Sequence, residues 1–394
     1  MAQAYDAVIA TIVVASDATS VTKAMVKSTQ WREGTSGTWL STDCTLNADT
    51  TYQFRTPLSG MSSSTTAVLP NIKASATVGW DTSATPISTV GAYFMYSYAR
   101  GCSNLTSLSV PDTSGLTSVG NSFMSYYAYY CSNLTSLSVP DTSGLTSVGN
   151  YFMRYYAYNC SKLNSLSVPD TSGLTTVGSS FMSSYAYGCS GLTSLSVPDT
   201  SELESVGDYF LYCYAYGCSG LTSLSVPNTP KLTSIGIEFM SYYAYHCTGI
   251  TSLSVPDTSG LTSVGDYFLS LYADGCTSLT SLSIPDTSGL TSVGDYFMYY
   301  YANGCSSLTS LILKGNTGWF SGHNVSWNVP SSRLNYLYAY CESAYWSNWK
   351  ELTASGKTLY INYIQATDHV LVTPSSVTPV VGEKYPLPPF RRSV

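Results

Sequence analysis

Residues 131–159 read CSNLTSLSVPDTSGLTSVGNYFMRYYAYN, and the same order of residues returns every 29 positions. Seven consecutive units follow one another without insertion or deletion. A fixed period of this length is typical of a solenoid or a related repeat array. The period is visible as a cysteine column (Cys102, Cys131, Cys160, Cys189, Cys218, Cys247, Cys276 and Cys305) and a phenylalanine column (Phe94, Phe123, Phe152, Phe181, Phe210, Phe239, Phe268 and Phe297).

The first half of each unit predicts a short strand followed by a turn. Leu134, Leu137 and Val139 have the spacing of a strand with one buried face. Pro140 lacks a backbone donor and is expected to end the strand. The residues from there to Gly144 are all turn formers.

The second half of each unit predicts a short helix. Phe152, Met153, Tyr156, Ala157 and Cys160 follow the spacing i, i+1, i+4, i+5, i+8, which is one face of a helix of about two turns. In six units the residue after the preceding glycine is Asn, Asp or Ser, as preferred at a helix N-cap. The predicted unit is therefore strand, turn, brief extended segment and capped helix.

One unit alone is too small to fold. Its apolar side chains contribute about 12 to 24 kcal/mol, whereas ordering its backbone costs about 30 to 60 kcal/mol. Stacked units bury each other's faces, so the array is expected to be held by its nearest-neighbour interfaces. Because strands stack about 4.8 Å apart and helices about 8 to 10 Å apart, we expect a curved solenoid with the strands inside.

The motif Cys-x-x-Leu-x-x-Leu-x-Val-Pro, followed by Leu-Thr-Ser-Val-Gly and Phe-Met-x-x-Tyr-Ala-x-x-Cys, resembles the BspA-like leucine-rich repeat family. The resemblance extends from about Gly79 to Leu313. It implies a leucine-rich-repeat-like solenoid and an association with surface display and adhesion to hosts or other cells. This chain has a longer unit and an extended tyrosine-rich segment, so the family's curvature does not automatically transfer.

Composition changes at both ends of the array predict four regions. Residues 1–78 are Thr-rich and alternating, as in a small β domain that could anchor the protein in an assembly. Residues 79–315 form the predicted solenoid. All seven tryptophans lie outside the repeats, and residues 316–369 are expected to form an aromatic cap over the open end. Residues 370–394 are predicted to be an extended Pro-rich arm.

Charge and motif content argue against several classes of function. Between residues 102 and 311, three basic side chains face thirteen acidic ones, so a nucleic-acid partner is not expected. No apolar run approaches the roughly 20 residues of a membrane span, and no basic residue precedes the apolar run of residues 7–15, so neither membrane insertion nor a signal peptide is predicted. The three histidines lie apart and no hydrolase, zinc-protease or phosphate-loop motif occurs. The sequence therefore predicts neither an enzyme nor a cofactor.

Two further columns allow both a structural and a functional interpretation. The cysteine column favours buried free thiols, with disulfides and metal binding as the alternatives. The aspartate column favours turn formation, with a ladder of calcium ligands as the alternative. No metal site is predicted from either. The aspartates are Asp112, Asp141, Asp170, Asp199, Asp257 and Asp286.

The tyrosines are the best candidates for a binding surface. One tyrosine per unit, such as Tyr156, lies on the predicted buried helix face. Others fall off that face and predict an exposed aromatic ridge, which favours contact with a partner because tyrosine offers a large amphipathic surface. The predicted ridge consists of Tyr126, Tyr129, Tyr155, Tyr158, Tyr187, Tyr216, Tyr242, Tyr245 and Tyr300.

Two functions are compatible with these features. The first is a structural component of a virus particle, such as a phage fibre or head decoration, favoured by the missing signal peptide, the separate N-terminal region and the near-identical units. The alternative is a cell-surface adhesin that binds host protein or glycan, favoured by the resemblance and the ridge. Either protein would act at a virion surface or an extracellular surface, multimeric in its assembly, with repeated weak contacts.

Overall fold

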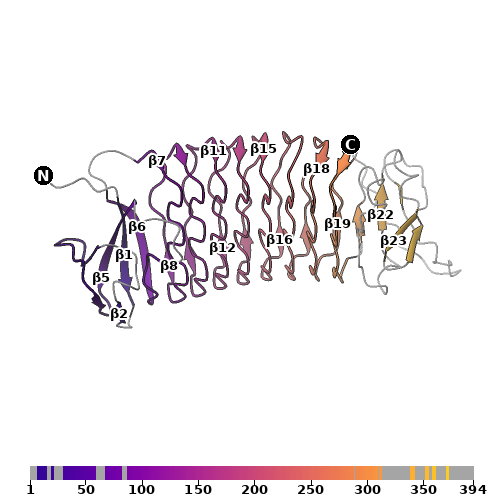
Figure 1. Cartoon of the computed structure of the whole chain (residues 1–394). Coiled ribbons are helices and arrows are strands. Elements are labelled where there is room, and N and C mark those ends of the chain that lie inside the picture. The colour runs from indigo at the N-terminus through magenta and orange to yellow at the C-terminus, as the bar shows by residue number, and fades with distance from the viewer. Residues whose placement is uncertain are drawn as a thin grey trace, which may run out of the picture.

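The computed structural model describes residues 7–15, 19–21, 30–58, 67–81, 87–287, 289–308 and 310–312, with strands at 338–341, 351–354, 357–360 and 370–371. Figure 1 shows a small sheet at the N-terminal end followed by coils that stand side by side. Most of the predicted cap, with its four tryptophans, lies outside the described residues, as does the predicted arm beyond Leu371. No helix in the described part of the chain is long and apolar enough to cross a bilayer.

The N-terminal sheet runs directly into the solenoid. Its strands are antiparallel in the order β3-β5-β1-β6, and alternate side chains of β1 and β5 are buried. Strand β6 then pairs in parallel with β8, the first strand of its column, with Ser75 opposite Ser107. The bounds are β1 Ala7–Val14, β3 Gln30–Glu33, β5 Thr51–Pro57 and β6 Ala74–Asp81, with a separate pair of β2 Thr19–Val21 and β4 Cys44–Leu46.

The coils of the solenoid contribute strands to two parallel columns, which confirms the predicted short strands. One coil joins the second column only through an isolated bridge from Ser234 to Ser263. Residues 29 apart pair with each other, as Ser136 does with Ser107. The first column contains β8 Ser107–Leu108, β10 Ser136–Leu137, β12 Ser165–Leu166, β14 Ser194–Leu195, β16 Ser223–Leu224, β17 Ser252–Leu253, β19 Ser281–Ser283 and β21 Ser310–Ile312. The second contains β7 Thr89–Val90, β9 Ser118–Val119, β11 Ser147–Val148, β13 Thr176–Val177, β15 Ser205–Val206, β18 Ser263–Val264 and β20 Ser292–Val293.

Beyond the last complete coil the first column continues. Strand β21 pairs in parallel with β22, which pairs antiparallel with β25, and β23 and β24 form a separate antiparallel pair. Their bounds are β22 Tyr338–Cys341, β23 Glu351–Ala354, β24 Lys357–Tyr360 and β25 Val370–Leu371.

The predicted helix is wrong: the coils described between residues 87 and 308 contain no α-helix. In residues 150–159, and at the equivalent positions of the other units, the backbone instead places alternate residues in the left-handed region. Tyr151, Met153 and Tyr155 have φ values of 61°, 48° and 58°. We call this stretch of each unit the tyrosine-rich segment.

Backbone hydrogen bonds of the tyrosine-rich segment run between coils and not along the chain. The amides of Tyr151 and Tyr155 donate to carbonyls of the following unit, at 2.8 and 2.9 Å, and the amide of Met153 donates to Phe123 of the preceding unit at 2.9 Å. Left-handed backbone costs about 1 to 2 kcal/mol per residue. These ladders offset that cost by giving partners to buried amides that would otherwise lack them.

The spacing of the units explains why a helix cannot form. Phenylalanine rings of neighbouring coils lie only 5.2 to 6.0 Å apart, whereas packed helices need about 8 to 10 Å. The tyrosine-rich segments therefore stack at nearly the strand spacing. The spacing between neighbouring coils is therefore nearly the same on the strand side and on the tyrosine-rich side, and Figure 1 shows the coils nearly parallel. The predicted curvature is consequently wrong.

The residues predicted as helix N-caps have a different role. The Asn121 side chain accepts a hydrogen bond from the amide of Asn150, whose own side chain accepts from Ser179, at 2.9 and 2.8 Å. Asp208 does the same for Ile237 at 3.0 Å. These side chains form a ladder between coils, which explains why Asn and Asp are preferred here without a helix.

Two stacks of buried aromatic rings fill the solenoid. Trp80 stacks on Phe94 at 5.5 Å and so begins the phenylalanine stack. Beside it runs a stack of fully buried tyrosines, one per unit, with rings 5.3 to 5.7 Å apart. From Tyr127 onward their hydroxyls have partners: Tyr185 donates to the Ser167 carbonyl at 2.7 Å, and the same bond recurs in each unit from Tyr127 to Tyr301.

The cysteine and aspartate columns take the structural roles that the sequence favours. Cys189 is a buried free thiol that donates to the Ala157 carbonyl at 2.9 Å, and the same bond recurs along the column. Asp141 accepts from the amide and the hydroxyl of Ser143, at 3.0 and 2.7 Å, which is a local turn. Groups of three or more metal-binding side chains are absent from the described residues.

A substitution of Gly217 distinguishes the observed backbone conformation from the predicted helix. Its φ is +71°, and an added Cβ would meet only ordinary contact, 3.8 Å from Gly188. We therefore expect Gly217→Ala to destabilise the protein by about 1 to 2 kcal/mol, measured by urea denaturation. In a helix the same change would stabilise it by about 0.5 to 1 kcal/mol. Ser219→Ala, at an exposed position nearby, is the control and should change little.

Candidate functional site: a tyrosine face along the solenoid

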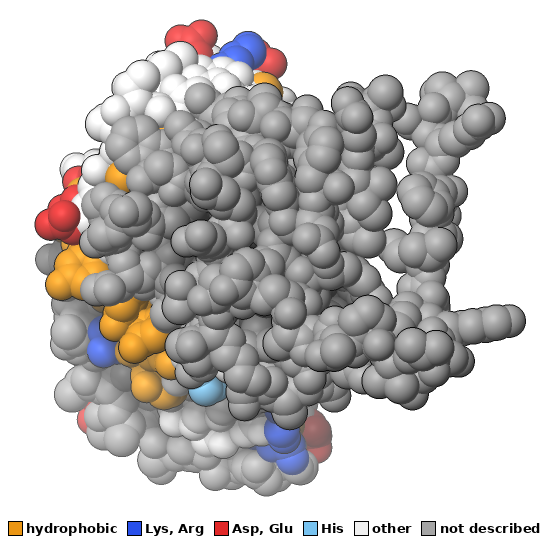
Figure 2. Space-filling model, turned by 90° about the vertical axis from the view of Figure 1, so that its right-hand side faces the viewer, with side chains coloured by type: hydrophobic (Ala, Val, Ile, Leu, Met, Phe, Trp, Pro, Cys, Tyr) orange, Lys and Arg blue, Asp and Glu red, His pale blue; other side chains and the backbone are white. Residues whose placement is uncertain are grey.

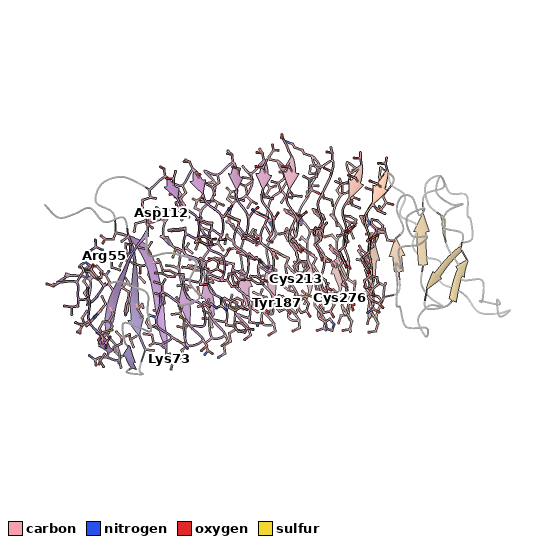
Figure 3. The ribbon with its side chains drawn as sticks, viewed as in Figure 1. Arg55, Lys73, Asp112, Tyr187, Cys213 and Cys276 are labelled. Carbon is pink, nitrogen blue, oxygen red and sulfur yellow. The ribbon has the colours of Figure 1, made fainter. Side chains whose placement is uncertain are left out.

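Five of the predicted ridge tyrosines form one continuous stack along the solenoid. Neighbouring rings lie 4.7, 4.4, 4.2 and 4.6 Å apart, with interplanar angles between 10° and 23°. The same position of five consecutive units supplies them, so the 29-residue period alone sets the register. Figure 3 marks one of them, Tyr187, in the central coils. We call this stack the tyrosine ladder: Tyr129, Tyr158, Tyr187, Tyr216 and Tyr245.

Three other predicted residues flank the ladder. Tyr126 lies 5.2 Å from Tyr129, Tyr155 lies 5.5 Å from Tyr158, and Tyr242 lies 5.4 Å from Tyr245, measured between ring centroids. The ninth, Tyr300, contacts Tyr299 at 4.0 Å. The structure thus joins eight of the nine predicted residues through ring contacts. All nine are half-buried, because each ring covers its neighbours.

Charge differs between the two ends of this face. Near the N-terminal end, the Arg100 guanidinium lies over the Tyr129 ring at 4.8 Å, and Arg154 lies over Tyr155 at 4.5 Å. At the other end, Tyr245 contacts the His246 ring at 4.3 Å. There Asp274 is buried and accepts a hydrogen bond from Asn303 at 3.0 Å.

Burial raises the pKa of several phenols of the face. It is the largest cause that raises the pKa of Tyr129 to about 12, followed by the neighbouring Tyr130. The pKa of Tyr187 is raised for the same reason, with a contribution from its hydrogen bond to Tyr216. At physiological pH Tyr129 and Tyr187 are therefore hydroxyl donors.

The most exposed aromatic residues were missed by the sequence analysis. Tyr93, Tyr130, Tyr151, Tyr209 and Tyr296 are between 38% and 47% exposed. Each occupies a left-handed position of its unit. The helical periodicity assumed for these segments does not distinguish these positions from other exposed ones. For Tyr93, Tyr151, Tyr209 and Tyr296 the available signal was their place directly before the column phenylalanine, whereas Tyr130 precedes Cys131 of the cysteine column. In Figure 2, which looks along the solenoid, hydrophobic side chains gather on one flank.

These features define a non-helical, leucine-rich-repeat-like solenoid with a tyrosine face. The BspA-type leucine-rich repeat region matches residues 97–184, 122–270 and 180–341, in six copies. Together these matches extend over residues 97–341, more than half of the 394. The chain belongs to the BspA-type leucine-rich repeat family.

One solved structure matches this chain. It is the crystal structure of a leucine-rich cell surface protein from Faecalibacterium prausnitzii, 15% identical, with 70% of this chain and 93% of that chain covered and a TM-score of 0.21. No protein with a curated description matches this chain.

Proposed function

We propose that this protein is a non-enzymatic adhesin, displayed on a cell surface, whose tyrosine face binds another protein. The observation that supports this best is the uninterrupted ladder, a half-buried aromatic strip along five coils. Tyrosine is enriched in protein interfaces, and a rigid strip loses little entropy on binding. Each coil offers a weak contact, and repetition raises the overall affinity.

The stacking of the ladder favours a protein over a glycan as the partner. A sugar binds an aromatic residue by lying on the face of its ring. Here the faces are occupied, because neighbouring rings such as Tyr187 and Tyr216 are nearly parallel and 4.2 Å apart. What remains accessible is ring edges and hydroxyl groups. A protein surface can pack against both and accept hydrogen bonds from the phenols.

Membership in the BspA-type family favours the cell surface over a virus particle. Members of this family are associated with surface display and adhesion, whereas none of the comparisons points to a virion. Electron microscopy of immunolabelled cells of the source distinguishes the two sites: label on the envelope is expected, and label on particles would contradict the proposal.

The role of the ladder can be tested with the full-length chain. We expect Tyr187→Ser with Tyr216→Ser to reduce binding to target cells at least tenfold, because it interrupts the strip at its centre. Flow cytometry with labelled protein measures this. The matched control is Thr193→Ser with Thr222→Ser, at exposed positions of the strand column in the same coils.

Treatment of the target cells identifies the class of partner. Protease treatment is expected to abolish binding, and glycosidase treatment to leave it intact. The opposite pattern would contradict a protein partner. Unchanged binding by the ladder variant would show that recognition lies elsewhere on the chain.

A further inference from the structure

The residue before the column phenylalanine forms a second surface column, which we call the outer column. Its large members project from the solenoid, with exposed fractions of 40% for Tyr93, 41% for Tyr151 and 38% for Tyr209. Between them lie two small residues, Ser122 and Ser180, that are only 5% exposed. From the first unit to the eighth, the outer column reads Tyr93, Ser122, Tyr151, Ser180, Tyr209, Glu238, Tyr267 and Tyr296.

The stacking distance between neighbouring units indicates how wide the gaps in the outer column are. Where two tyrosines occupy neighbouring units, as Tyr267 and Tyr296 do, their rings stack at 4.6 Å and 7°. Tyrosines two units apart are therefore separated by about twice an ordinary stacking distance. A ring inserted over Ser122 or Ser180 would stack on both neighbours.

The projecting rings are held in place from the side. Tyr93 and Tyr209 each meet a second tyrosine edge to face, at 5.7 Å. The Arg154 guanidinium lies 5.5 Å from the centre of the Tyr151 ring. Such preorganised side chains lose little conformational entropy when a partner binds.

The outer column is complementary to itself when a second copy is turned end for end. In that arrangement the first unit of one copy faces the eighth of the other, the second faces the seventh, and so on. Ser122 then faces Tyr267, and Ser180 faces Tyr209. Each gap thereby receives a ring from the partner, and two tyrosines meet only at the ends of the contact. A two-fold axis pairs the same surface of both copies in this way.

Opposite charges also face each other in this antiparallel register. The third unit has Arg154, and the sixth, which it would face, has Glu238 in the outer column. Because Arg154 lies beside Tyr151, its guanidinium is at the level of the outer column. Both side chains are half-buried, and Arg154 Nη2 donates to the Tyr155 hydroxyl at 2.9 Å. Two symmetric Arg–Glu contacts would form in the antiparallel pair.

We propose that two copies of this chain associate antiparallel through the outer column, with tyrosines of each copy inserted over Ser122 and Ser180 of the other. The partner is a second copy because the sizes along the column and the charges match together when the column is reversed upon itself. This proposal concerns a different column and a different partner from the ladder. Either proposal can fail while the other holds.

Sedimentation velocity of the full-length chain, from about 1 to about 100 µM, tests the pairing. We expect a concentration-dependent dimer. Ser180→Tyr should raise its dissociation constant at least tenfold by filling the central gap. The variant should fold normally, because Ser180 has a φ of 60° and Tyr151 and Tyr209 have 61° and 59° at the equivalent positions.

Charge reversal tests the register. Arg154→Glu and Glu238→Arg should each weaken the dimer, and the double variant should restore it, because the reversed charges would again face each other. Lys231→Glu, at an exposed ion pair outside the column, is the control and should change nothing. A chain that stays monomeric over the whole range would overturn the proposal. So would a dimer that Ser180→Tyr and the single reversals leave unchanged.

Discussion

Phe210→Ala is expected to destabilise the protein by about 3 to 5 kcal/mol. Phe210 is fully buried and stacks between Phe181 at 5.6 Å and Phe239 at 5.2 Å. Neighbouring coils cannot move together to close the cavity, because both strand columns and the backbone ladders fix their spacing. Urea denaturation followed by circular dichroism measures the loss.

Tyr209→Ala is the matched control for this substitution. Tyr209 precedes Phe210 in the chain but projects outward. Its loss should cost under about 1 kcal/mol. Equal losses for the two variants would mean that the phenylalanine stack is not the core of the solenoid.

The protein is expected to unfold steeply as the pH rises above about 9. Burial raises the pKa of the Cys131 and Cys247 thiols from 9.0 to about 12, and it raises the pKa of buried tyrosines such as Tyr185. Between pH 9 and 12 a thiol ionises in the unfolded chain but not in the folded one. Stability is therefore complete below pH 9, and each buried thiol lowers it by about 1.4 kcal/mol per pH unit above that value.

Urea midpoints measured at several pH values between 7 and 11 test this expectation. Cys131→Ala should lose less stability over that range than the parent protein, because one thiol has been removed. Its lower stability at pH 7 serves as the internal reference. A midpoint that stays constant up to pH 11 would contradict the burial of the cysteine column.

The sequence predicted the strand half of each unit well. Strand positions such as Leu137, the turn at Asp141 and the thiol of Cys189 follow from the local pattern and its repetition. Each of these depends on contacts within a coil or with an identical neighbour. A strict repeat makes such contacts readable, because whatever suits one coil must suit the next.

The tyrosine-rich half could not be predicted in the same way. Phe152 and Tyr156 are buried as expected, since the spacing i, i+4 marks one face in a helix. In the observed backbone, where alternate residues are left-handed, the same residues are also buried. The periodicity of the sequence therefore did not distinguish the two conformations. The spacing between coils decided between them, and that quantity is a property of the stack and not of a unit.

The sequence predicted which tyrosines form the candidate surface but not how exposed they are. The sequence placed Tyr216 on an open ridge, whereas it is half-buried between Tyr187 and Tyr245. Its removal should therefore cost about 1 to 2 kcal/mol, more than an ordinary surface change. The most exposed of the described tyrosines, such as Tyr151, occupy left-handed positions, and a helical pattern does not predict their exposure.

The backbone ladders give the tyrosine-rich side of the solenoid an electrical direction. The amides of Tyr151, Tyr155, Ala157 and Asn159 point toward the following unit, whereas in this segment Met153 points toward the preceding one. Amides beside the strand columns, such as those of Thr175 and Gly178, also donate to the preceding unit, so the direction belongs to the tyrosine-rich side alone. Peptide dipoles aligned in this way add up, as they do in a helix, to partial positive charge at the C-terminal end and partial negative charge at the N-terminal end. Arg100 lies near the negative end, and Asp274 lies near the positive one. These charged side chains thus complement a dipole on the tyrosine-rich side of the stack, although no helix produces it.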